Sequence, residues 1–251
     1  MPEQFAFRMM YFMPRFISRL TAQIIFFFCF ISSAPTAFAD LSDADKSEIK
    51  SIIKEFIKEN PIIIRDVLTQ LATTEQAQRK LAALALVKND DGDPKIGPSD
   101  AAITIYEFSD YNCGYCKRIF NDLQAVLAEQ PDVRLVVKEF PILAETSVLA
   151  AKAAIAAHRQ GKFRQFHISM MTWRGKIDGD AIDAAVQKAG LDKNRLRKDM
   201  EDELTAAILS KTRAAAAALE VRGTPALIIG ETMIPGAISK NEILDLINQT
   251  R

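Results

Sequence analysis

Apolar residues between positions 40 and 87 repeat with the period of an α-helix on an otherwise charged stretch. In the first helix they follow the spacing i, i+3, i+4, i+7, i+8, at Ile49, Ile52, Ile53, Phe56 and Ile57. Asn60-Pro61 supplies an N-cap and a first-turn proline for a second helix, which carries apolar residues of its own. These stripes must be buried against something. Packing on a main domain is one possibility, and self-association into a homo-oligomer is the one that we favour.

The pattern changes after a polar stretch with two glycines and two prolines at 88–100, which predicts a connector. Residues 101–108 and 133–140 are rich in β-formers and flank a helical stretch that ends near Glu129. This β-α-β unit implies a parallel pair of strands. Residues 144–219 are helical in pattern, and two short strands at 225–229 and 232–234 precede a final helix at 240–248. We therefore predict an α/β domain over 101–251 with a helical insert, preceded by an all-helical module over 40–87.

The first 39 residues have the composition of a secretory signal peptide. Arg8, Arg15 and Arg19 precede an apolar run over 24–31, and small residues lead to Ala37-Phe38-Ala39. A transmembrane helix needs about 20 apolar residues, more than this run provides. We expect cleavage after Ala39 and export to the periplasm. A lipid-modified Cys29 is a weaker alternative, because phenylalanines precede it instead of small residues.

Cleavage would leave two cysteines, Cys113 and Cys116, in a single C-x-x-C motif. A structural zinc site needs four ligands, and only two histidines could complete one. Haem attachment requires a histidine where this chain has Lys117. Thiol–disulfide exchange needs only the two sulfurs, without a metal or another cofactor. We expect exchange chemistry at this motif.

The position of the motif predicts different roles for the two sulfurs. Cys113 directly follows the first strand and opens a helix, where free backbone N–H groups and the helix dipole stabilise a thiolate. Cys113, the more exposed of the two, should therefore attack a substrate disulfide. Cys116, one turn further and more buried, should resolve the mixed disulfide.

Two other functions, nucleic-acid binding and copper binding, find little support in the sequence. Lys plus Arg and Asp plus Glu number 32 each, so the formal net charge is zero and nothing indicates a nucleic-acid partner. His167 with Met170 and Met171 could suggest copper, because imidazole and thioether are suitable ligands. Their helical spacing with the nearby phenylalanines instead predicts core packing.

The order of elements, the C-x-x-C helix and Gly223-Thr224-Pro225 before the hairpin together resemble the thioredoxin fold of DsbA-type enzymes. The resemblance covers 101–251. It implies that Pro225 follows a cis peptide bond in a loop facing the motif, and that Thr224 and Pro225 bind an extended substrate segment beside Cys113. Tyr111 and Tyr115 are expected to line the same substrate surface.

The resemblance also assigns a role to Glu107, six residues before Cys113. DsbA-like enzymes place a buried acid there, which would relay the proton of Cys116. A strand-end surface glutamate is the alternative. Lys138 on the neighbouring strand is a candidate partner for Glu107.

Two details direct the expected function toward disulfide isomerisation. Gly114-Tyr115 and Thr224 are similar to the isomerase DsbC and depart from the Pro-His and Val-Pro pairs of the oxidase DsbA, so we expect a less oxidising site. The helices over 40–87 resemble the oligomerisation helices of ScsC-like relatives. The implied partners are misfolded exported proteins and a membrane redox protein, either a DsbD-like reductant or a DsbB-like oxidant. A DsbA-type oxidase and a copper-tolerance protein that uses the two thiols remain alternatives.

Overall fold

The computed structural model describes residues 41–251 of the chain, so the predicted signal peptide and its cleavage site lie outside the described residues. The chain divides into two compact units, Met1–Asp66 and Val67–Arg251. Within the described part, no helix combines the length and the apolar character needed to cross a bilayer.

The described residues of the first unit form two helical segments. Helix α2 (Asp43–Glu59) begins with a capping box, in which Ser42 and Asp45 satisfy each other's backbone N–H groups. Helix α3 (Pro61–Lys88) begins at the proline, as predicted. Asn60 was predicted as the N-cap of this helix, but its side-chain amide donates to the backbone oxygen of Phe56 at 2.9 Å and so closes α2 instead.

The second unit contains a five-stranded sheet in the order β1-β3-β2-β4-β5 within residues 67–251. Strands β2 and β3 are parallel and joined through helix α4, which confirms the predicted β-α-β unit. The other pairings are antiparallel. The elements of this frame are β1 (Lys95–Ile96), β2 (Ile103–Ser109), α4 (Gly114–Glu129), β3 (Val133–Glu139), β4 (Ala226–Ile229), β5 (Thr232–Pro235) and α10 (Lys240–Thr250).

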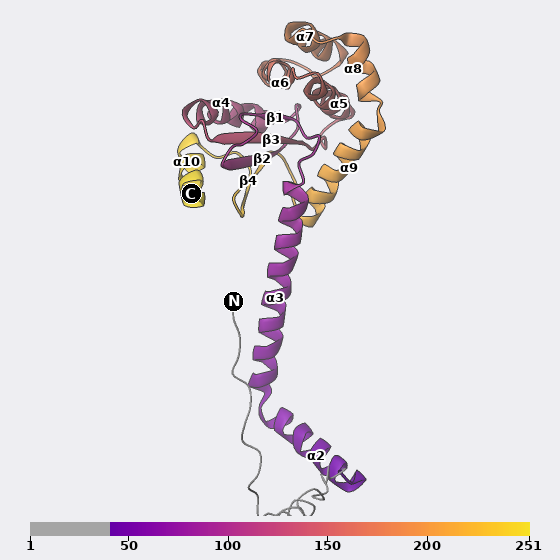
Figure 1. Ribbon diagram of the computed structural model, residues 1–251, viewed down its shortest axis with the longest axis vertical. Helices are drawn as coiled ribbons and strands as arrows, with labels where there is room; N and C mark the ends of the chain where they lie inside the picture. Colours follow the sequence, from indigo (N-terminus) through magenta and orange to yellow (C-terminus); the bar gives the residue numbers. More distant parts are fainter. Residues whose placement is uncertain (1–40) are drawn as a thin grey trace, which may run out of the picture. The chain divides into compact units, whose positions relative to one another are not determined.

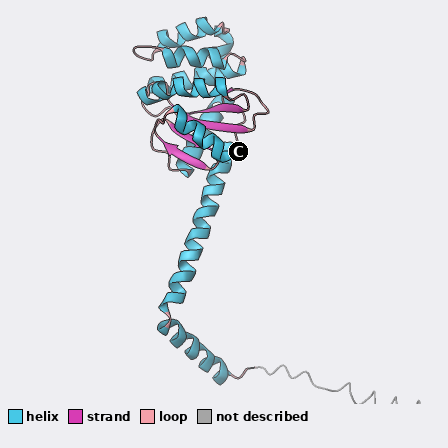
Figure 2. Cartoon of the chain, turned by 90° about the vertical axis from the view of Figure 1, so that its left-hand side faces the viewer, coloured by secondary structure: helices cyan, strands magenta, loops and turns pink. Residues whose placement is uncertain are grey.

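A run of helices between β3 and β4 forms the predicted insert. Figure 1 shows α5 to α8 grouped together, with α9 leading back toward the sheet, and Figure 2 shows helices beside the strands. The helices are α5 (Glu145–Arg159), α6 (Phe163–Thr172), α7 (Gly179–Ala189), α8 (Lys193–Met200) and α9 (Glu203–Ala218). The architecture is a thioredoxin-like fold with a helical insertion, as expected.

Alternation along the central strands sends side chains to two different cores. Ile105 and Val137 join the larger core with α4, α10 and the insert. Tyr106 and Val136 belong to the opposite face, which packs on the end of α3 and on α9. Every second residue of β2 and β3 therefore faces the C-x-x-C helix, and the residues between them face the other core.

The segment 88–100, predicted as a connector, is integrated into the second unit. It contains β1, which pairs with β3. Asp93 is fully buried and accepts a 2.6 Å hydrogen bond from Lys138 of β3. Asp90 forms ion pairs with Lys95 and Arg134. The segment is polar because its carboxylates bind buried and half-buried cations, a long-range arrangement that its composition does not reveal.

Candidate active site

The two cysteines lie at the start of α4, directly after the end of β2. Cys113 is the N-cap of α4, and its sulfur accepts a 3.4 Å contact from the backbone N–H of Cys116. Both are free thiols. Cys113 is 5% exposed and Cys116 is fully buried. The predicted order of exposure therefore holds, although Cys113 is also largely covered, and the helix N-terminus points its N–H groups at the first sulfur.

A loop far along the chain covers Cys113. The peptide bond between Thr224 and Pro225 is cis, as the resemblance implied. The Cys113 thiol donates to the backbone oxygen of Thr224 at 3.1 Å. The fold thus brings the predicted substrate-binding residues Thr224 and Pro225 beside the predicted nucleophile. A peptide that binds the Thr224 backbone oxygen in place of the Cys113 thiol would lie alongside the backbone of this loop.

A groove extends from this loop along the second unit. It has a volume of about 1230 Å³ and is lined by the loop Arg222–Ala226, by Met233 and Pro235 of β5, and by residues of α3 that include Gln76. The cis-proline loop and apolar residues such as Met233 and Pro235 thus border one groove.

Glu107 lies inside the protein and not at the surface. It is 1% exposed, on the face of β2 that meets α4. Burial raises the pKa of Glu107 to about 7. Burial, and then the negative charge of Glu107, raises the pKa of the Cys116 thiol above its usual range. A carboxyl that titrates near neutrality behind a thiol that resists ionisation is suited to exchange a proton with it.

Lys138 was the wrong partner for Glu107. In the sheet register Glu107 lies opposite Val137, whereas Lys138 lies opposite Phe108. Lys138 therefore faces the other core, where its ammonium binds Asp93 and the backbone oxygen of Asn89. The one-residue offset sends the two side chains to opposite faces of the sheet.

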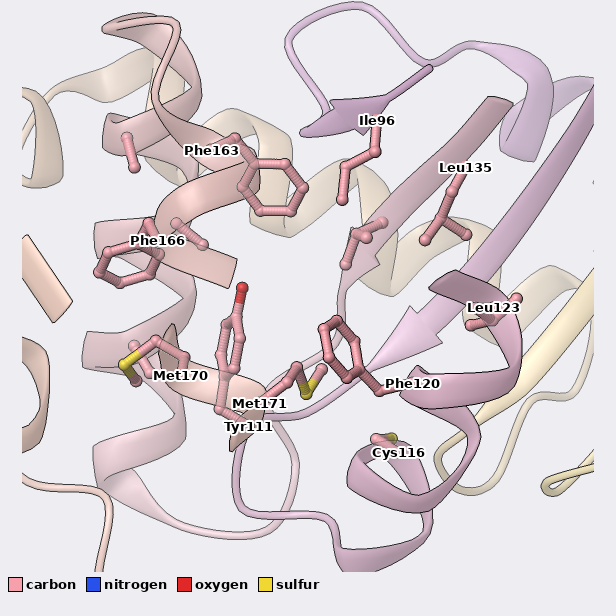
Figure 3. Packing of buried hydrophobic residues seen from close by; sticks show 14 of the residues in the cluster. Ile96, Tyr111, Cys116, Phe120, Leu123, Leu135, Phe163, Phe166, Met170 and Met171 are labelled. Carbon is pink, nitrogen blue, oxygen red and sulfur yellow. The ribbon is translucent and has the colours of Figure 1, made fainter. Parts of the chain in front are cut away.

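The two tyrosines of the motif have different environments. Tyr115 is 59% exposed, with the guanidinium of Arg118 4.6 Å from the ring centre, and it is available to a substrate. Tyr111 is only 1% exposed, so the expectation that it lines the substrate surface was wrong. Figure 3 shows its ring between Phe166 and Phe120, with the hydroxyl inside the core.

Sequence reasoning missed Asp110, which fixes the loop before the motif. This buried carboxylate accepts hydrogen bonds from the backbone N–H groups of Asn112, Ile142 and Leu143 and from the Ser147 hydroxyl. It holds the C-x-x-C loop against the loop that follows β3. Three of these four partners lie more than 30 residues away, and an aspartate directly after a strand could not have indicated them.

The histidine and methionines considered as copper ligands are core residues, as their spacing predicted. His167, Met170 and Met171 are buried in the larger core. The Nδ1 atom of His167 lies 2.9 Å from the Tyr111 hydroxyl. Among residues 41–251 there is no cluster of three or more His, Cys, Asp or Glu side chains suited to a metal ion.

A thioredoxin-like fold in which a dithiol opens a helix opposite a cis-proline loop defines the class of thiol–disulfide oxidoreductases. The model of the DSBA-like thioredoxin domain matches residues 104–248, more than half of the chain. The chain belongs to the family of the DSBA-like thioredoxin domain.

Solved structures of similar proteins agree with this assignment. A thioredoxin-like oxidoreductase from Silicibacter pomeroyi is 35% identical, with a TM-score of 0.64 over 66% of this chain and 96% of that one. A periplasmic thioredoxin-like protein from Salmonella enterica serovar Typhimurium is 33% identical, with a TM-score of 0.62 over 67% and 95%. Proteus mirabilis ScsC in a transitional conformation is 26% identical, with a TM-score of 0.63 over 84% and 97%.

Curated relatives include much longer proteins. The Na(+)/H(+) antiporter NhaA 3 of Salinispora tropica is 26% identical over 168 residues, which are 64% of this chain and 26% of the antiporter. The chain thus spans about a quarter of the length of this relative.

Proposed function

We propose that this protein is an exported disulfide isomerase that acts on misfolded proteins of the periplasm through Cys113 and Cys116. The observation that carries the proposal is the contact between the Cys113 sulfur, at the N-cap of α4, and the Thr224 backbone in the cis-proline loop. A substrate cysteine bound along that loop would lie next to the attacking sulfur. The resemblance to a periplasmic thioredoxin-like protein and the signal-peptide pattern support export.

In the proposed reaction the Cys113 thiolate attacks one sulfur of a substrate disulfide. A mixed disulfide forms, and the other substrate sulfur leaves as a thiolate. In isomerisation that thiolate, or another in the substrate, attacks a different disulfide, and the last attack displaces Cys113 unchanged. In the escape reaction Cys116 gives its proton to Glu107 and attacks the Cys113 sulfur. The enzyme is then oxidised, the substrate is reduced by two electrons, and a membrane redox partner must restore the dithiol.

Two features favour isomerase over oxidase. Gly114-Tyr115 and Thr224 have the DsbC-like identities, and Tyr115 is exposed beside the motif. The apolar stripe of α2 lies on the surface, where Ile52 is 59% and Phe56 is 53% exposed. Such a stripe is suited to self-association, which would shield a reduced site from reoxidation.

Refolding of scrambled ribonuclease tests the proposal. Cys113→Ala should abolish activity, because no sulfur remains to attack the substrate. Cys116→Ala should retain part of the isomerisation and accumulate mixed disulfides. If Cys113→Ala refolds scrambled ribonuclease as the parent does, the enzyme proposal fails.

The same variants distinguish the alternatives. An oxidase would act on reduced ribonuclease and not on the scrambled form. A copper carrier would bind Cu(I) through both thiols and would leave refolding unaffected by either substitution.

A further inference from the structure

Three buried polar side chains of the second unit have no role in the reaction described above. They are Tyr111, Glu139 and His167, each at most 1% exposed. Tyr111 comes from the loop before the motif, Glu139 ends β3, and His167 belongs to α6 of the insert. Burying polar groups costs free energy, so three together in a core require an explanation.

These side chains form one hydrogen-bonded chain. The Tyr111 hydroxyl donates to Glu139 Oε1 at 3.1 Å, and the Tyr111 hydroxyl oxygen also lies 2.9 Å from His167 Nδ1. A tyrosine has one hydroxyl proton. When that proton is donated to Glu139, His167 must donate its own Nδ1 proton to the tyrosine oxygen. All donors in the chain then point toward the Glu139 carboxylate, which is the arrangement that stabilises a negative charge there.

Glu107 is the second carboxyl in this region. It pairs with Val137, two residues before Glu139 on the neighbouring parallel strand, so the two glutamates project to the same face of the sheet. A strand spacing of ~4.8 Å and a rise of ~3.3 Å per residue place their Cα atoms about 8 Å apart. Two negative charges at this separation in a dry core repel strongly.

Each carboxyl has one buried oxygen without a hydrogen-bond partner within residues 41–251, Glu107 Oε1 and Glu139 Oε2, and the other oxygen of Glu139 accepts the hydrogen bond of the Tyr111 hydroxyl. Burial raises the pKa of Glu139 well above its ordinary value, the Tyr111 hydrogen bond opposes this rise, and the charges of Asp110, Glu107 and Asp93 add to it. The ionisation of each glutamate therefore bears on the other.

We propose that Glu107 and Glu139 share one titratable proton behind Cys116, and that Tyr111 and His167 are positioning residues that let Glu139 carry the negative charge. Before this step the pair holds no proton. When Cys116 transfers its proton to Glu107 and attacks Cys113, that proton becomes the one the pair holds, and the charge of Glu107 is lost. The Tyr111–His167 chain then supports a carboxylate at Glu139. When the dithiol is restored, the proton returns from Glu107 to the Cys116 sulfur. The inference rests on the proposed roles of Cys113, Cys116 and Glu107.

The other charged or titratable groups near these hydrogen-bonded side chains have partners or environments of their own. Asp110, on the motif loop, accepts four hydrogen bonds, and Asp93 pairs with Lys138 on the opposite face of the sheet. From α4 the thiol of Cys116 faces Glu107, and from α6 His167 is kept neutral because burial lowers its pKa to about 3. Glu107 and Glu139 are thus left as the pair between which a proton can be divided.

The test is the pH dependence of the resolving step. Reduced enzyme is mixed with excess oxidised glutathione between pH 4 and 9 and quenched with acid. Mass spectrometry then follows the conversion of the Cys113–glutathione mixed disulfide into the enzyme disulfide. Glu139→Gln removes the charge at Glu139, and Tyr111→Phe removes the hydrogen bond that stabilises this charge, so both relieve the repulsion acting on Glu107. We expect both to move the midpoint of the profile down by about 1 pH unit, since Glu107 then becomes a base at lower pH.

Controls separate this role from a structural one. Phe166→Leu alters an edge-to-face neighbour of Tyr111 in the same core but removes no polar group. It should lower the melting temperature and leave the midpoint unchanged. If Tyr111→Phe and Glu139→Gln also leave the midpoint in place, the shared proton is refuted. Cys116→Ser must stop at the mixed disulfide, and if it does not, the assigned cysteine roles fail independently of the network.

Discussion

At the scale of single residues, the site depends on the environments of a few buried groups. Cys116 and Glu107 are both inside the core, and burial favours the neutral form of each. Asp110, equally buried, keeps its loop in place through hydrogen bonds from backbone and hydroxyl donors. Two buried carboxyls thus lie within one short segment, and only that of Asp110 accepts hydrogen bonds from several backbone N–H groups.

Glu107 should make the stability of the protein depend on pH. Its pKa is raised from 4.5 to about 7 on folding, so the stability associated with it is present below pH 4.5 and is lost as the pH rises to about 7. The loss amounts to at most about 3 kcal/mol. Glu107→Gln should therefore be more stable than the parent at pH 8 and about equal to it at pH 4. Urea unfolding at both pH values checks this.

The control for Glu107 is Glu231→Gln, which removes an exposed carboxylate in the turn between β4 and β5. It should change the free energy of unfolding little at either pH. An effect of Glu107→Gln that is the same at pH 4 and pH 8 would contradict the assignment of a raised pKa.

At the scale of elements, the segment before β2 shows that a polar stretch can be part of a core. Lys138 and Asp93 are both fully buried and form a 2.6 Å ion pair between β3 and the segment after α3. Lys211 of α9 also approaches Asp93, at 3.4 Å. Burial lowers the pKa of Lys138, and the charge and hydrogen bond of Asp93 oppose that change. The pair joins three elements on the face of the sheet opposite the dithiol.

Breaking this pair should be costly. Lys138→Met leaves Asp93 buried beside a weaker partner, and we expect a loss of about 3–5 kcal/mol in the free energy of unfolding. The double variant Lys138→Met/Asp93→Leu should recover much of that loss, because no charge then remains buried. Lys193→Met, which breaks an exposed ion pair of the same 2.6 Å length, should cost less than about 1 kcal/mol. Equal losses in the two single variants would show that the burial of the first pair is irrelevant to stability.

At the scale of the whole molecule, the chain combines a catalytic unit with an N-terminal helical unit whose apolar residues are on the surface. Ile53 and Phe56 are 52% and 53% exposed, and their neighbours in the stripe are similarly uncovered. In a folded chain, apolar side chains at helical spacing with this exposure indicate an interface. Assembly through α2 therefore belongs to the proposed function as much as the dithiol does.

Charges in the stripe should dissociate the assembly. Ile53→Asp/Phe56→Asp should reduce the molar mass measured by light scattering to that of one chain. Scrambled-ribonuclease refolding should fall several-fold, while thiol exchange of Cys113 with glutathione stays unchanged. Ser51→Asp places a charge on the opposite side of α2 and should preserve the assembly. A parent protein that is already monomeric would rule out this interface.

The sequence by itself determined the features that depend on local pattern. Periodicity located most of the strands and helices, and the position of Cys113 after a strand predicted the helix N-terminus at its sulfur. The burial of Glu107 was implied by the family resemblance and not by the local pattern. The family resemblance added the loop at Pro225. These features could be predicted because backbone geometry relates neighbouring residues in a fixed way.

Tertiary structure decided which distant groups meet. Only the sheet register shows that Lys138 turns toward Asp93 and away from Glu107. Only the packing of α6 against the motif loop buries Tyr111 and brings His167 to its hydroxyl. Each of these contacts joins residues tens of positions apart, and their energies depend on burial that the whole fold creates. The C-x-x-C motif therefore predicted the chemistry, and the folded core around it raises the pKa values of Glu107 and Cys116.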